Sequence, residues 1–366
     1  MPRFTHKGVL TRSLFLQKKK LMKTRVYPLL LTLFVLTACT DSAPATPQMQ
    51  APDLLSITAF AETEPVPDDD DAADDPYIMV TQTGKTIIAG TNKRRGVELY
   101  NLQGQRLASI DSGRVNNIDG FYNAETQTFQ LAGSNRTTTQ VDVYRVTTAP
   151  VDIQLALTFD LPLAEPYGLC VSPNLIYVGD KEGKVQSWSW DGSGPVATYV
   201  FDSQTEGCVV DTQNSHLYVG EEMTGIWRVD LASDTAPTLF VPISDTLLVG
   251  DVEGLDIYSS DDRRVLVASS QGDSTYIAYD LTTAELLTKF AIAPSGKGSN
   301  IGSVDGTQDT DGIAVTNANI DGHPKGLLVV QDGFNVDSAG SAANQNFKIV
   351  DWRDVEALFT DDETKR

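Results

Sequence analysis

Histidine and cysteine are scarce in this sequence of 366 residues, which contains three of each. His216 and His323, the two histidines beyond the N-terminal region, are not in an Arg-His-Gly motif, which argues against a phosphohistidine mechanism. Neither Cys170 nor Cys208 begins a Cys-x5-Arg loop, which argues against a cysteinyl-phosphate intermediate. Serine-hydrolase Gly-x-Ser-x-Gly motifs, Walker loops and Cys-x-x-Cys zinc motifs are also lacking.

Long segments with helical periodicity are equally scarce. From about Asp75 onward, short runs rich in Val, Ile, Tyr and Thr are separated by Gly, Asn and Asp. A chain of this length can form two average domains or one large all-β domain. The composition favours the all-β fold class.

Basic residues are outnumbered, because 28 Lys and Arg stand against 49 Asp and Glu, for a formal net charge of -21. The first 38 residues contain eight of these basic residues and no acid, so the rest of the chain has a net charge of -29. Such a surface repels nucleic acid and anionic membranes. If this protein binds an anion, bound cations must lie between the two.

The N-terminus has the pattern of a targeting segment. A lysine-rich stretch precedes an apolar run from Val26 to Leu36, which is short for a membrane span and ends in Leu36-Thr37-Ala38-Cys39. We interpret residues 1–38 as a lipoprotein signal peptide, starting at Met1 or Met22, and Cys39 as the lipidated residue. The predicted location is extracytoplasmic, at the outer membrane, with the lipid as the only membrane contact.

Residues 39–73 are rich in Pro, Ala and Thr and end in the acidic run 68–71, so we predict a flexible, solvated linker. Cys170 and Cys208 remain in the mature chain. An extracytoplasmic location permits a disulfide, but both cysteines lie in apolar strand patterns, which favours buried thiols.

The remaining residues, 74–366, contain about six copies of one repeating unit. Each begins with a polar cluster that leads into an apolar strand: Asp74-Asp75-Pro76, Asn116-Asn117, Pro166-Tyr167-Gly168, Thr205-Glu206-Gly207, Asp251-Val252-Glu253-Gly254 and Asp309-Thr310-Asp311-Gly312. Each continues with an apolar strand that ends in a polar turn: 87–94, 130–136, 176–182, 217–222, 265–271 and 327–333. A third strand often contains aromatic residues. This spacing predicts a six-bladed β-propeller of four-stranded antiparallel blades.

In an antiparallel blade, the start of the first strand and the end of the second lie at the same end of the sheet. All twelve polar clusters are therefore expected on one face, around the mouth of the central channel. Repeated glycines at these positions let the backbone approach a ligand closely. Polar loops alone would be the simpler explanation, but they do not explain why charged residues recur in corresponding positions.

Asp251 and Glu253 are separated by one residue, so on an extended segment both carboxylates point to the same side. Such a pair suits a hard cation such as calcium, which takes six to eight oxygen ligands. Lys93, Arg136 and Lys181, from the first three units, supply charges suited to phosphate. Metal ions bound by these carboxylates, together with the neighbouring basic residues, would bind a polyanion and activate a water for attack on a phosphate ester.

Residues 74–352 resemble the β-propeller phytases, calcium-dependent enzymes that dephosphorylate myo-inositol hexakisphosphate. The resemblance rests on an ordered set of short motifs, which includes the polar clusters above and Ser134-Asn135-Arg136, Lys181-Glu182-Gly183, Glu221-Glu222, Ser269-Ser270-Gln271-Gly272, Asp305-Gly306-Thr307, Gln331-Asp332-Gly333 and Asn344-Gln345-Asn346-Phe347-Lys348. Phe334 departs from the family, which commonly has an acidic residue there.

The resemblance implies a role for each matching residue. It implies that substrate phosphate is bound by Lys93, Arg94, Arg136, Tyr167 and Lys181. It implies active-site calcium ligands at Asp75, Glu206, Glu222, Asp251, Glu253, Gln271 and Asp311, and ligands of calcium ions that brace the propeller at Asn117, Asp305 and Asn335. The residues closest to the chemistry would be Lys93, Arg136, Tyr167, Lys181, Asp251 and Glu253.

The leading hypothesis is therefore a monomeric, calcium-dependent phytase that acts on phytate or lower inositol phosphates as calcium complexes. Two alternatives remain open at this point. One is a non-catalytic, calcium-braced propeller that binds a glycan, a polyanion or a partner protein. The other is a propeller hydrolase of another ester or lactone, which would not need Lys93, Arg136 and Lys181.

Overall fold

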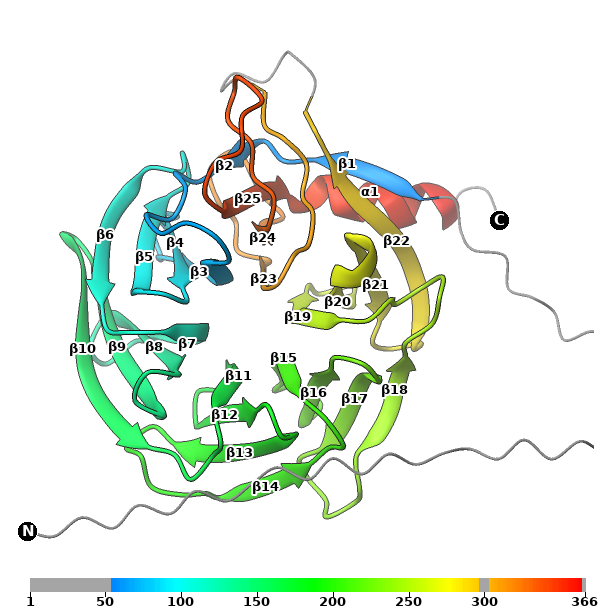
Figure 1. Ribbon diagram of the computed structural model, residues 1–366. Helices are drawn as coiled ribbons and strands as arrows, with labels where there is room; N and C mark the ends of the chain where they lie inside the picture. Colours follow the sequence, from blue (N-terminus) through cyan, green and yellow to red (C-terminus); the bar gives the residue numbers. More distant parts are fainter. Residues whose placement is uncertain (1–53, 296–302, 364–366) are drawn as a thin grey trace, which may run out of the picture. The chain divides into compact units, whose positions relative to one another are not determined.

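The computed structural model describes residues 54–295 and 303–363, so the predicted signal peptide and Cys39 lie outside the described residues. Six sheets, here called blades one to six, are arranged around a central axis (Figure 1). The predicted all-β, six-bladed propeller is confirmed. Each blade has its first strand at the axis and successive strands further out.

The strands occupy equivalent places in every blade. The innermost strands are β3 (Ala73–Val80), β7 (Val115–Asn123), β11 (Pro166–Val171), β15 (Thr205–Asp211), β19 (Val252–Ser259) and β23 (Ile313–Thr316). The second strands are β4 (Thr86–Asn92), β8 (Thr128–Asn135), β12 (Leu175–Asp180), β16 (His216–Glu221), β20 (Arg264–Ser270) and β24 (Leu327–Asp332). The third strands are β5 (Gly96–Asn101), β9 (Gln140–Thr148), β13 (Lys184–Ser189), β17 (Gly225–Asp230), β21 (Thr275–Asp280) and β25 (Asn346–Asp351). The outer strands of blades one to five are β6 (Arg106–Asp111), β10 (Val151–Asp160), β14 (Ala197–Val200), β18 (Thr238–Pro242) and β22 (Glu285–Ala293).

The predicted linker 39–73 is wrong at its C-terminal end, because the chain enters the propeller well before residue 74. Strand β2 (Ala61–Glu62) pairs with β25 and is the outer strand of blade six. Strand β1 (Leu55–Thr58) lies parallel to β22 and adds a fifth strand to blade five. The N-terminal segment therefore closes the ring against the C-terminal blade. Strands of two and four residues give little periodic signal, and their partners lie 288 and 235 residues away in sequence.

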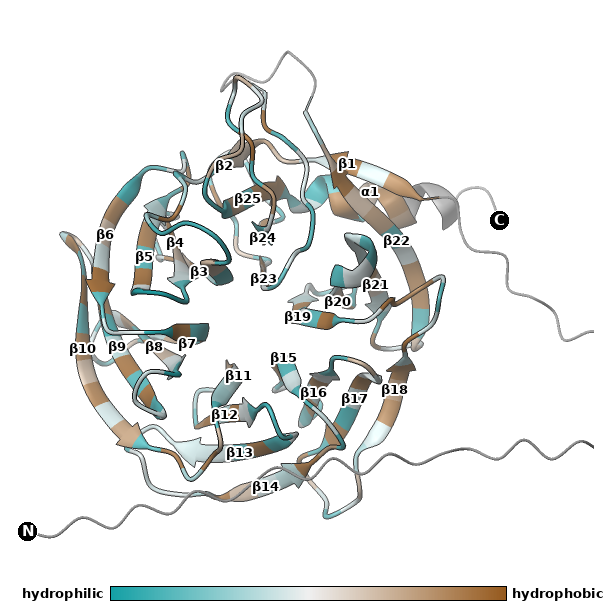
Figure 2. Ribbon diagram, viewed as in Figure 1, coloured by the Kyte–Doolittle hydropathy of each residue, from teal (hydrophilic) through white to brown (hydrophobic). Residues whose placement is uncertain are grey.

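Six hydrophobic clusters hold the ring together, one at each interface between neighbouring blades. Both faces of each sheet are covered in this way, so strands such as β4 are buried at every residue. Figure 2 shows hydrophobic residues along the middle strands of the blades. A strand that is buried on both faces has a continuous apolar sequence and not an alternating one, as in Ile87-Ile88-Ala89.

The C-terminal helix α1 (Trp352–Glu363) packs into the interface between blades five and six. Trp352 stacks on Tyr258 with ring centroids 3.9 Å apart, and Val355 and Phe359 continue the same buried face. In the described part of the chain, no helix combines the length and the apolar character that crossing a bilayer requires.

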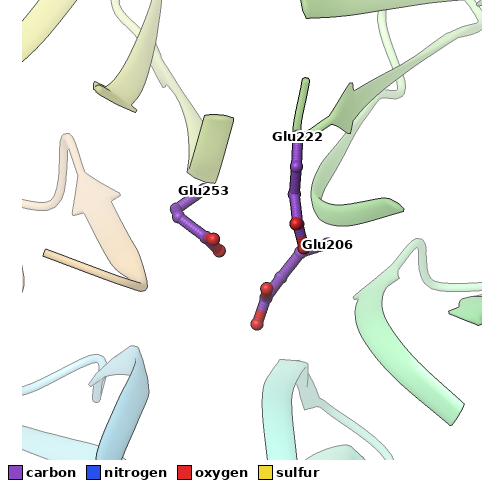
Figure 3. Close-up of side chains that lie close together, drawn as sticks. All are labelled: Glu206, Glu222 and Glu253. Atoms are coloured by element: carbon purple, nitrogen blue, oxygen red, sulfur yellow. The ribbon is translucent and has the colours of Figure 1, made fainter. Parts of the chain in front are cut away.

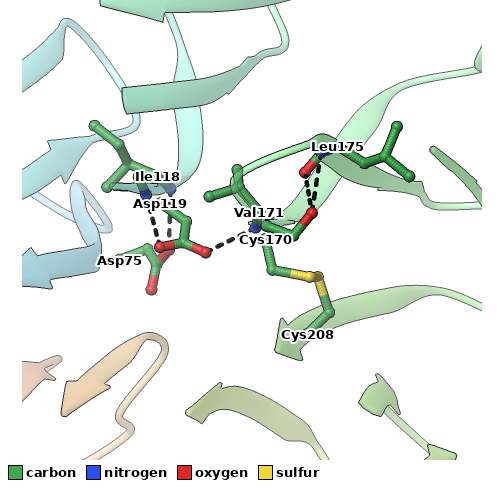
Figure 4. Close-up of a disulfide and its surroundings, with 9 residues drawn as sticks. Asp75, Ile118, Asp119, Cys170, Val171, Leu175 and Cys208 are labelled. Atoms are coloured by element: carbon green, nitrogen blue, oxygen red, sulfur yellow. Dashed lines mark hydrogen bonds between the residues drawn. A yellow bond between two sulfur atoms is a disulfide. The ribbon is translucent and has the colours of Figure 1, made fainter. Parts of the chain in front are cut away.

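The prediction of free buried thiols is also wrong. Cys170 on β11 and Cys208 on β15 form a disulfide, with Cα atoms 5.5 Å apart (Figure 4). The two cysteines are separated by 38 residues in sequence, but the ring places the inner strands of blades three and four side by side. Burial and disulfide formation are compatible here, because both residues lie in the core of one blade interface.

Candidate metal and phosphate site

The polar residues of the repeat lie where the innermost strands are irregular. In five blades, the pairing between the first and second strands skips two residues at its start. The skipped pairs are Asp74-Asp75, Asn116-Asn117, Tyr167-Gly168, Glu206-Gly207 and Glu253-Gly254. An irregularity of this kind releases side chains from the regular alternation and redirects them. The repeat therefore encodes a ring of redirected polar residues near the axis.

The glycines in these pairs have a different role from the one that we predicted. A Cβ at Gly168 would lie 1.8 Å from the carbonyl oxygen of Glu206, and one at Gly207 would lie 1.9 Å from that of Glu253. Gly254 meets the backbone of Gly312 and Ile313 in the same manner. The glycines thus allow each inner strand to approach the next blade, and not a ligand, and they bring successive site residues together.

Three glutamates from two neighbouring blades form the centre of the acidic region. Glu206 is on β15, Glu222 follows β16 and Glu253 is on β19, and a carboxylate oxygen of each lies within 4.8 Å of the others (Figure 3). Burial, together with Glu206, raises the pKa of Glu222 to about 7. Burial and Glu206 also raise the pKa of Glu253 well above its usual range. These carboxylates resist ionisation together unless a cation joins them.

The atoms around this cluster fit a hard cation. Glu253 Oε2 is buried and has no hydrogen-bond partner, and the same is true of Asn116 Oδ1. Asn116 donates to Glu206 Oε1 (2.7 Å) and to Asn117 Oδ1 (2.9 Å), so it fixes the glutamate from another blade. Buried oxygens without donors are costly, and carboxylate and amide oxygens are the ligands that calcium prefers. Asn116 was missed as a site residue, although it occupies the same place in the repeat as Glu206.

A second cluster joins blades six and one. Lys93 Nζ lies 2.7 Å from Asp311 Oδ2, 2.7 Å from Asp71 Oδ1 and 3.6 Å from Asp74 Oδ2. Burial alone would lower the pKa of Lys93, but the carboxylates around it raise the pKa, so it stays charged. Burial raises the pKa of Asp311 to about 6, although the neighbouring ammonium group of Lys93 acts to lower it.

Gln271 donates from Nε2 to Asp311 Oδ1 (2.6 Å), which connects blade five to this cluster. The predicted calcium ligands therefore lie in two groups. Gln271 contacts Asp311, and Glu206 lies with Glu222 and Glu253. Asp251 lies beside Glu222, whose pKa it raises, but it is not one of the group of three. Its predicted pairing with Glu253 stays a prediction.

Arg136, Tyr167 and Lys181 form the basic part of the site. The Arg136 guanidinium carbon lies 5.2 Å from the centre of the Tyr167 ring, and Lys181 Nζ lies 4.2 Å from it. Such cation–π contacts hold both cations in place without neutralising them. Arg136 Nε is buried and has no hydrogen-bond partner. The acidic group nearest to this side chain is Glu165, whose Oε1 lies 3.9 Å from Arg136 Nη1. This arrangement leaves positive charge available to an anionic ligand.

Asp75 and Asn117 lie at the channel side of the ring. Asp75 Oδ2 accepts a hydrogen bond from the Ile118 amide (3.0 Å) and thereby joins blades one and two. Burial raises the pKa of Asp75 well above its usual range. Both residues are buried at the inner-strand starts, as the repeat predicts, and their assignment as calcium ligands stays a prediction.

Asp305 and Asn335 meet each other away from the glutamates. Both surround the ammonium group of the fully buried Lys348, which donates to Asn335 Oδ1 (3.0 Å) and to Asp305 Oδ1. Glu62 Oε2 (2.5 Å) and Asp332 Oδ2 (3.2 Å) complete this cluster. The predicted calcium ligands therefore already share a cation from the protein itself. Lys348 was not predicted, and the assignment of Asp305 and Asn335 to calcium stays a prediction.

We predicted from its composition that the acidic run 68–71 belongs to a solvated linker, but the structure shows that the run contacts the propeller. It lies against the turn 93–95, where Asp70 pairs with Arg94 (3.2 Å) and Asp71 pairs with Lys93. Arg94, a predicted phosphate ligand, is thus half-exposed and beside Lys93, but it already has a partner. Composition alone could not reveal the contact, because an acidic run far from basic residues has the same sequence signature.

Comparison with known proteins identifies the family of this chain. The family model described as Phytase matches residues 23–168 and 180–365. The chain is 32% identical over 330 residues to a protein named 3-phytase from Bacillus subtilis (strain 168), which covers 82% of this chain and 85% of that protein. Among solved structures, a chain of the mitotic checkpoint complex is 13% identical with a TM-score of 0.47, and covers 88% of this chain and 99% of that chain. A chain of a nidogen/laminin complex is 13% identical with a TM-score of 0.46, and covers 60% and 79%. Because the family model spans most of the sequence and the relative is similar over more than four fifths of it, the chain belongs to the phytase family and is a phosphate ester hydrolase.

Proposed function

We propose that this enzyme is a calcium-dependent phytase that hydrolyses phosphate monoesters of myo-inositol hexakisphosphate, bound as its calcium complex. The observation that carries the proposal is the position of three buried or half-buried glutamates, with oxygens within 4.8 Å of one another, at the end of the blades where Arg136 and Lys181 directly follow second strands. A cluster of carboxylates repels phosphate unless bound cations neutralise its negative charge. Arg136 and Lys181 add positive charge that supports the binding of an anion at this face.

The residues of the site have different roles in the proposed reaction. Arg136 and Lys181 bind phosphate oxygens, and the Tyr167 ring between them fixes the distance between the two charges. The planar guanidinium of Arg136 is suited to forked binding of phosphate, whereas Lys181 acts as a point charge. Glu206, Glu222 and Glu253 would hold calcium, with Asn116 orienting Glu206. When bound, calcium supplies positive charge that polarises the phosphoryl group and lowers the pKa of a water.

The basic part and Lys93 lie in different blades, so the face offers phosphate ligands at more than one place. A substrate with several phosphates can contact both places, while a simple monoester can contact only one. We therefore infer a preference for inositol polyphosphates over monoesters.

Phosphate release from calcium phytate, with and without a chelator, tests the proposal. We expect release with calcium and loss of most activity when the chelator is in excess, restored by added calcium. Release that is unchanged by the chelator would contradict calcium dependence. Binding of phytate without any release in calcium would instead support the non-catalytic alternative.

We also propose that the mature chain is tethered outside the cytoplasm by a lipid on Cys39. The lysine-rich start, the apolar run and Leu36-Thr37-Ala38-Cys39 support this proposal, and the Cys170–Cys208 disulfide suits an oxidising compartment. Membrane fractionation of the wild type and of Cys39→Ser tests it. The wild type should remain with membranes, and the variant should be released or remain unprocessed. Equal membrane retention of a processed variant would contradict it.

A further inference from the structure

Two short segments of opposite charge lie against each other beside the site. One is the acidic segment 68–71, and the other is the basic turn 93–95. Their contacts run in antiparallel order: Asp68 Oδ2 with Arg95 Nε (2.9 Å), Asp70 Oδ2 with Arg94 Nη2 (3.2 Å) and Asp71 Oδ1 with Lys93 Nζ (2.7 Å). In the described part of the chain, Asp69 makes no ion pair and is exposed. The segment thus neutralises the same basic turn that is available for phosphate.

The acidic segment is held in place at both ends. The amide of Val66 donates to the carbonyl of Gln345 (2.9 Å), and the amides of Ala72 and Ala73 donate to Gln345 Oε1 (2.7 and 2.9 Å). Asp68 also accepts from Asn92 Nδ2 (2.8 Å). The arch between these anchors is short, so its carboxylates are kept near the basic turn at a high effective concentration.

The outer contacts of the arch are weak enough to exchange. The side chains of Asp70 and Asp71 are 76% and 69% exposed, and that of Arg94 is 44% exposed. The Asp70–Arg94 pair is thus exposed on both sides, and such pairs contribute little and are screened by salt. Lys93 is only 8% exposed and keeps its contact with Asp311, so the Asp71–Lys93 pair is exposed on the side of Asp71 alone. A phosphate group has more charge than a carboxylate and more oxygens, and it forms stronger charge-assisted hydrogen bonds with Arg and Lys.

We propose that the segment 68–71 is an intramolecular competitor of the substrate. Asp70 and Asp71 occupy Arg94 and Lys93 in the free enzyme, and a substrate phosphate binds to these two residues by displacing the carboxylates. Asp68 anchors the arch and is not displaced, because its contacts to Arg95 and Asn92 lie further from Lys93 along the turn. The inference rests on the proposed function in one respect, namely that the ligand is a phosphate.

The test measures binding without turnover. The probes are inorganic phosphate and the non-hydrolysable polyanion myo-inositol hexasulfate, titrated calorimetrically into the wild type and Asp70→Asn/Asp71→Asn in buffered calcium. We expect the double variant to bind the hexasulfate about two- to tenfold more tightly, because two exposed pairs no longer compete. Asp69→Asn removes the same charge from the same arch without removing an ion pair, and its affinity should stay within about 1.5-fold of the wild type. Melting temperatures of all variants verify folding.

A double-mutant cycle separates displacement from a general charge effect. In an Arg94→Gln background, Asp70→Asn should no longer change affinity, because the group for which the carboxylate competes is gone. Unchanged or weaker binding by Asp70→Asn/Asp71→Asn, or an equal gain from Asp69→Asn, would overturn the inference. These outcomes are independent of the proposed function, which fails if the wild type releases no phosphate from calcium phytate or if the chelator leaves the release unchanged.

Discussion

The basic and acidic parts of the site differ in how their charges are compensated. In blades one to three, each cation has a protein partner: Lys93 has carboxylates, and Arg136 and Lys181 share the Tyr167 ring. In blades four and five, Glu206, Glu222 and Glu253 lie together, and among the described residues none of them forms an ion pair with Lys or Arg. Neighbouring carboxylates therefore stabilise the charged state of Lys93 against the effect of burial, whereas burial and neighbouring carboxylates both oppose the charged state of Glu222 and Glu253.

This difference indicates which part is complete without a ligand. The basic part is assembled by contacts within the chain, so it is expected to keep its geometry whether or not metal is bound. The acidic part has raised pKa values and an unpartnered buried oxygen on Glu253, so its residues fit a bound cation. The predictions below test this asymmetry.

The largest effect is expected when the acidic part loses a ligand. Glu253→Ala should lower kcat/KM for calcium phytate by about 10²- to 10³-fold, because a preorganised stabilising group is removed. Asp251→Ala should cost less, since Asp251 lies outside the group of three. Initial rates over a calcium titration measure both, and the exposed Glu125→Gln on a blade-two loop is the control. Equal losses for Glu253→Ala and Asp251→Ala would restore the pairing predicted from sequence.

The boundary between the two parts contains the disulfide, which joins blades three and four. Cys170→Ala/Cys208→Ala should lower the free energy of unfolding by about 2–4 kcal/mol, since the bond closes a loop of 38 residues. Urea denaturation with and without reductant measures the loss, and reductant should affect only the wild type. A large loss of kcat/KM in the double variant, measured where it is still folded, would show that the disulfide also positions the site.

Removal of a cation from the basic part should weaken substrate binding but leave the acidic part able to bind metal. Arg136→Ala should lower kcat/KM by about 10- to 100-fold through the loss of charge-assisted hydrogen bonds to phosphate. Its calcium affinity, measured by calorimetry without substrate, should change little. Arg114→Ala, at an exposed arginine of the same blade, is the matched control. Loss of calcium binding in Arg136→Ala would contradict the independence of the two parts.

The smallest effect concerns pH and is restricted to the acidic part. The folded protein holds the pKa of Glu222 at about 7, above its ordinary value of 4.5, so between these values the folded state binds more protons than the unfolded state. The free energy of unfolding of metal-free protein should therefore fall as the pH rises from about 4.5 to about 7. Calcium needs the ionised carboxylates, so it should raise the melting temperature more at pH 8 than at pH 6. Thermal melts with calcium or chelator measure this, and a larger calcium effect at pH 6 would contradict it.

Much of this site was predictable because its signals are local. Asp74-Asp75, Glu206-Gly207 and Asp311-Gly312 each stand at the start of an apolar strand, and their recurrence predicted both the propeller and the shared face. Strand alternation and turn preference depend on neighbouring residues, so these features can be read from short stretches. Alternation is interrupted at the starts of five inner strands, where a register shift such as the one between Val252 and Leu255 releases the site residues from the regular pattern.

The sequence by itself determined the repeating unit, the number of blades and the residue types around the channel mouth. Only the tertiary structure decided the Cys170–Cys208 bond, the closing strands β1 and β2, and the contact of Asp71 with Lys93. The disulfide joins neighbouring blades, β1 and β2 join the N-terminal segment to blades five and six, and Asp71 meets Lys93 from a segment that Gln345 holds through Ala72. Such contacts follow from the closure of the ring, which brings distant segments together after the local units have formed.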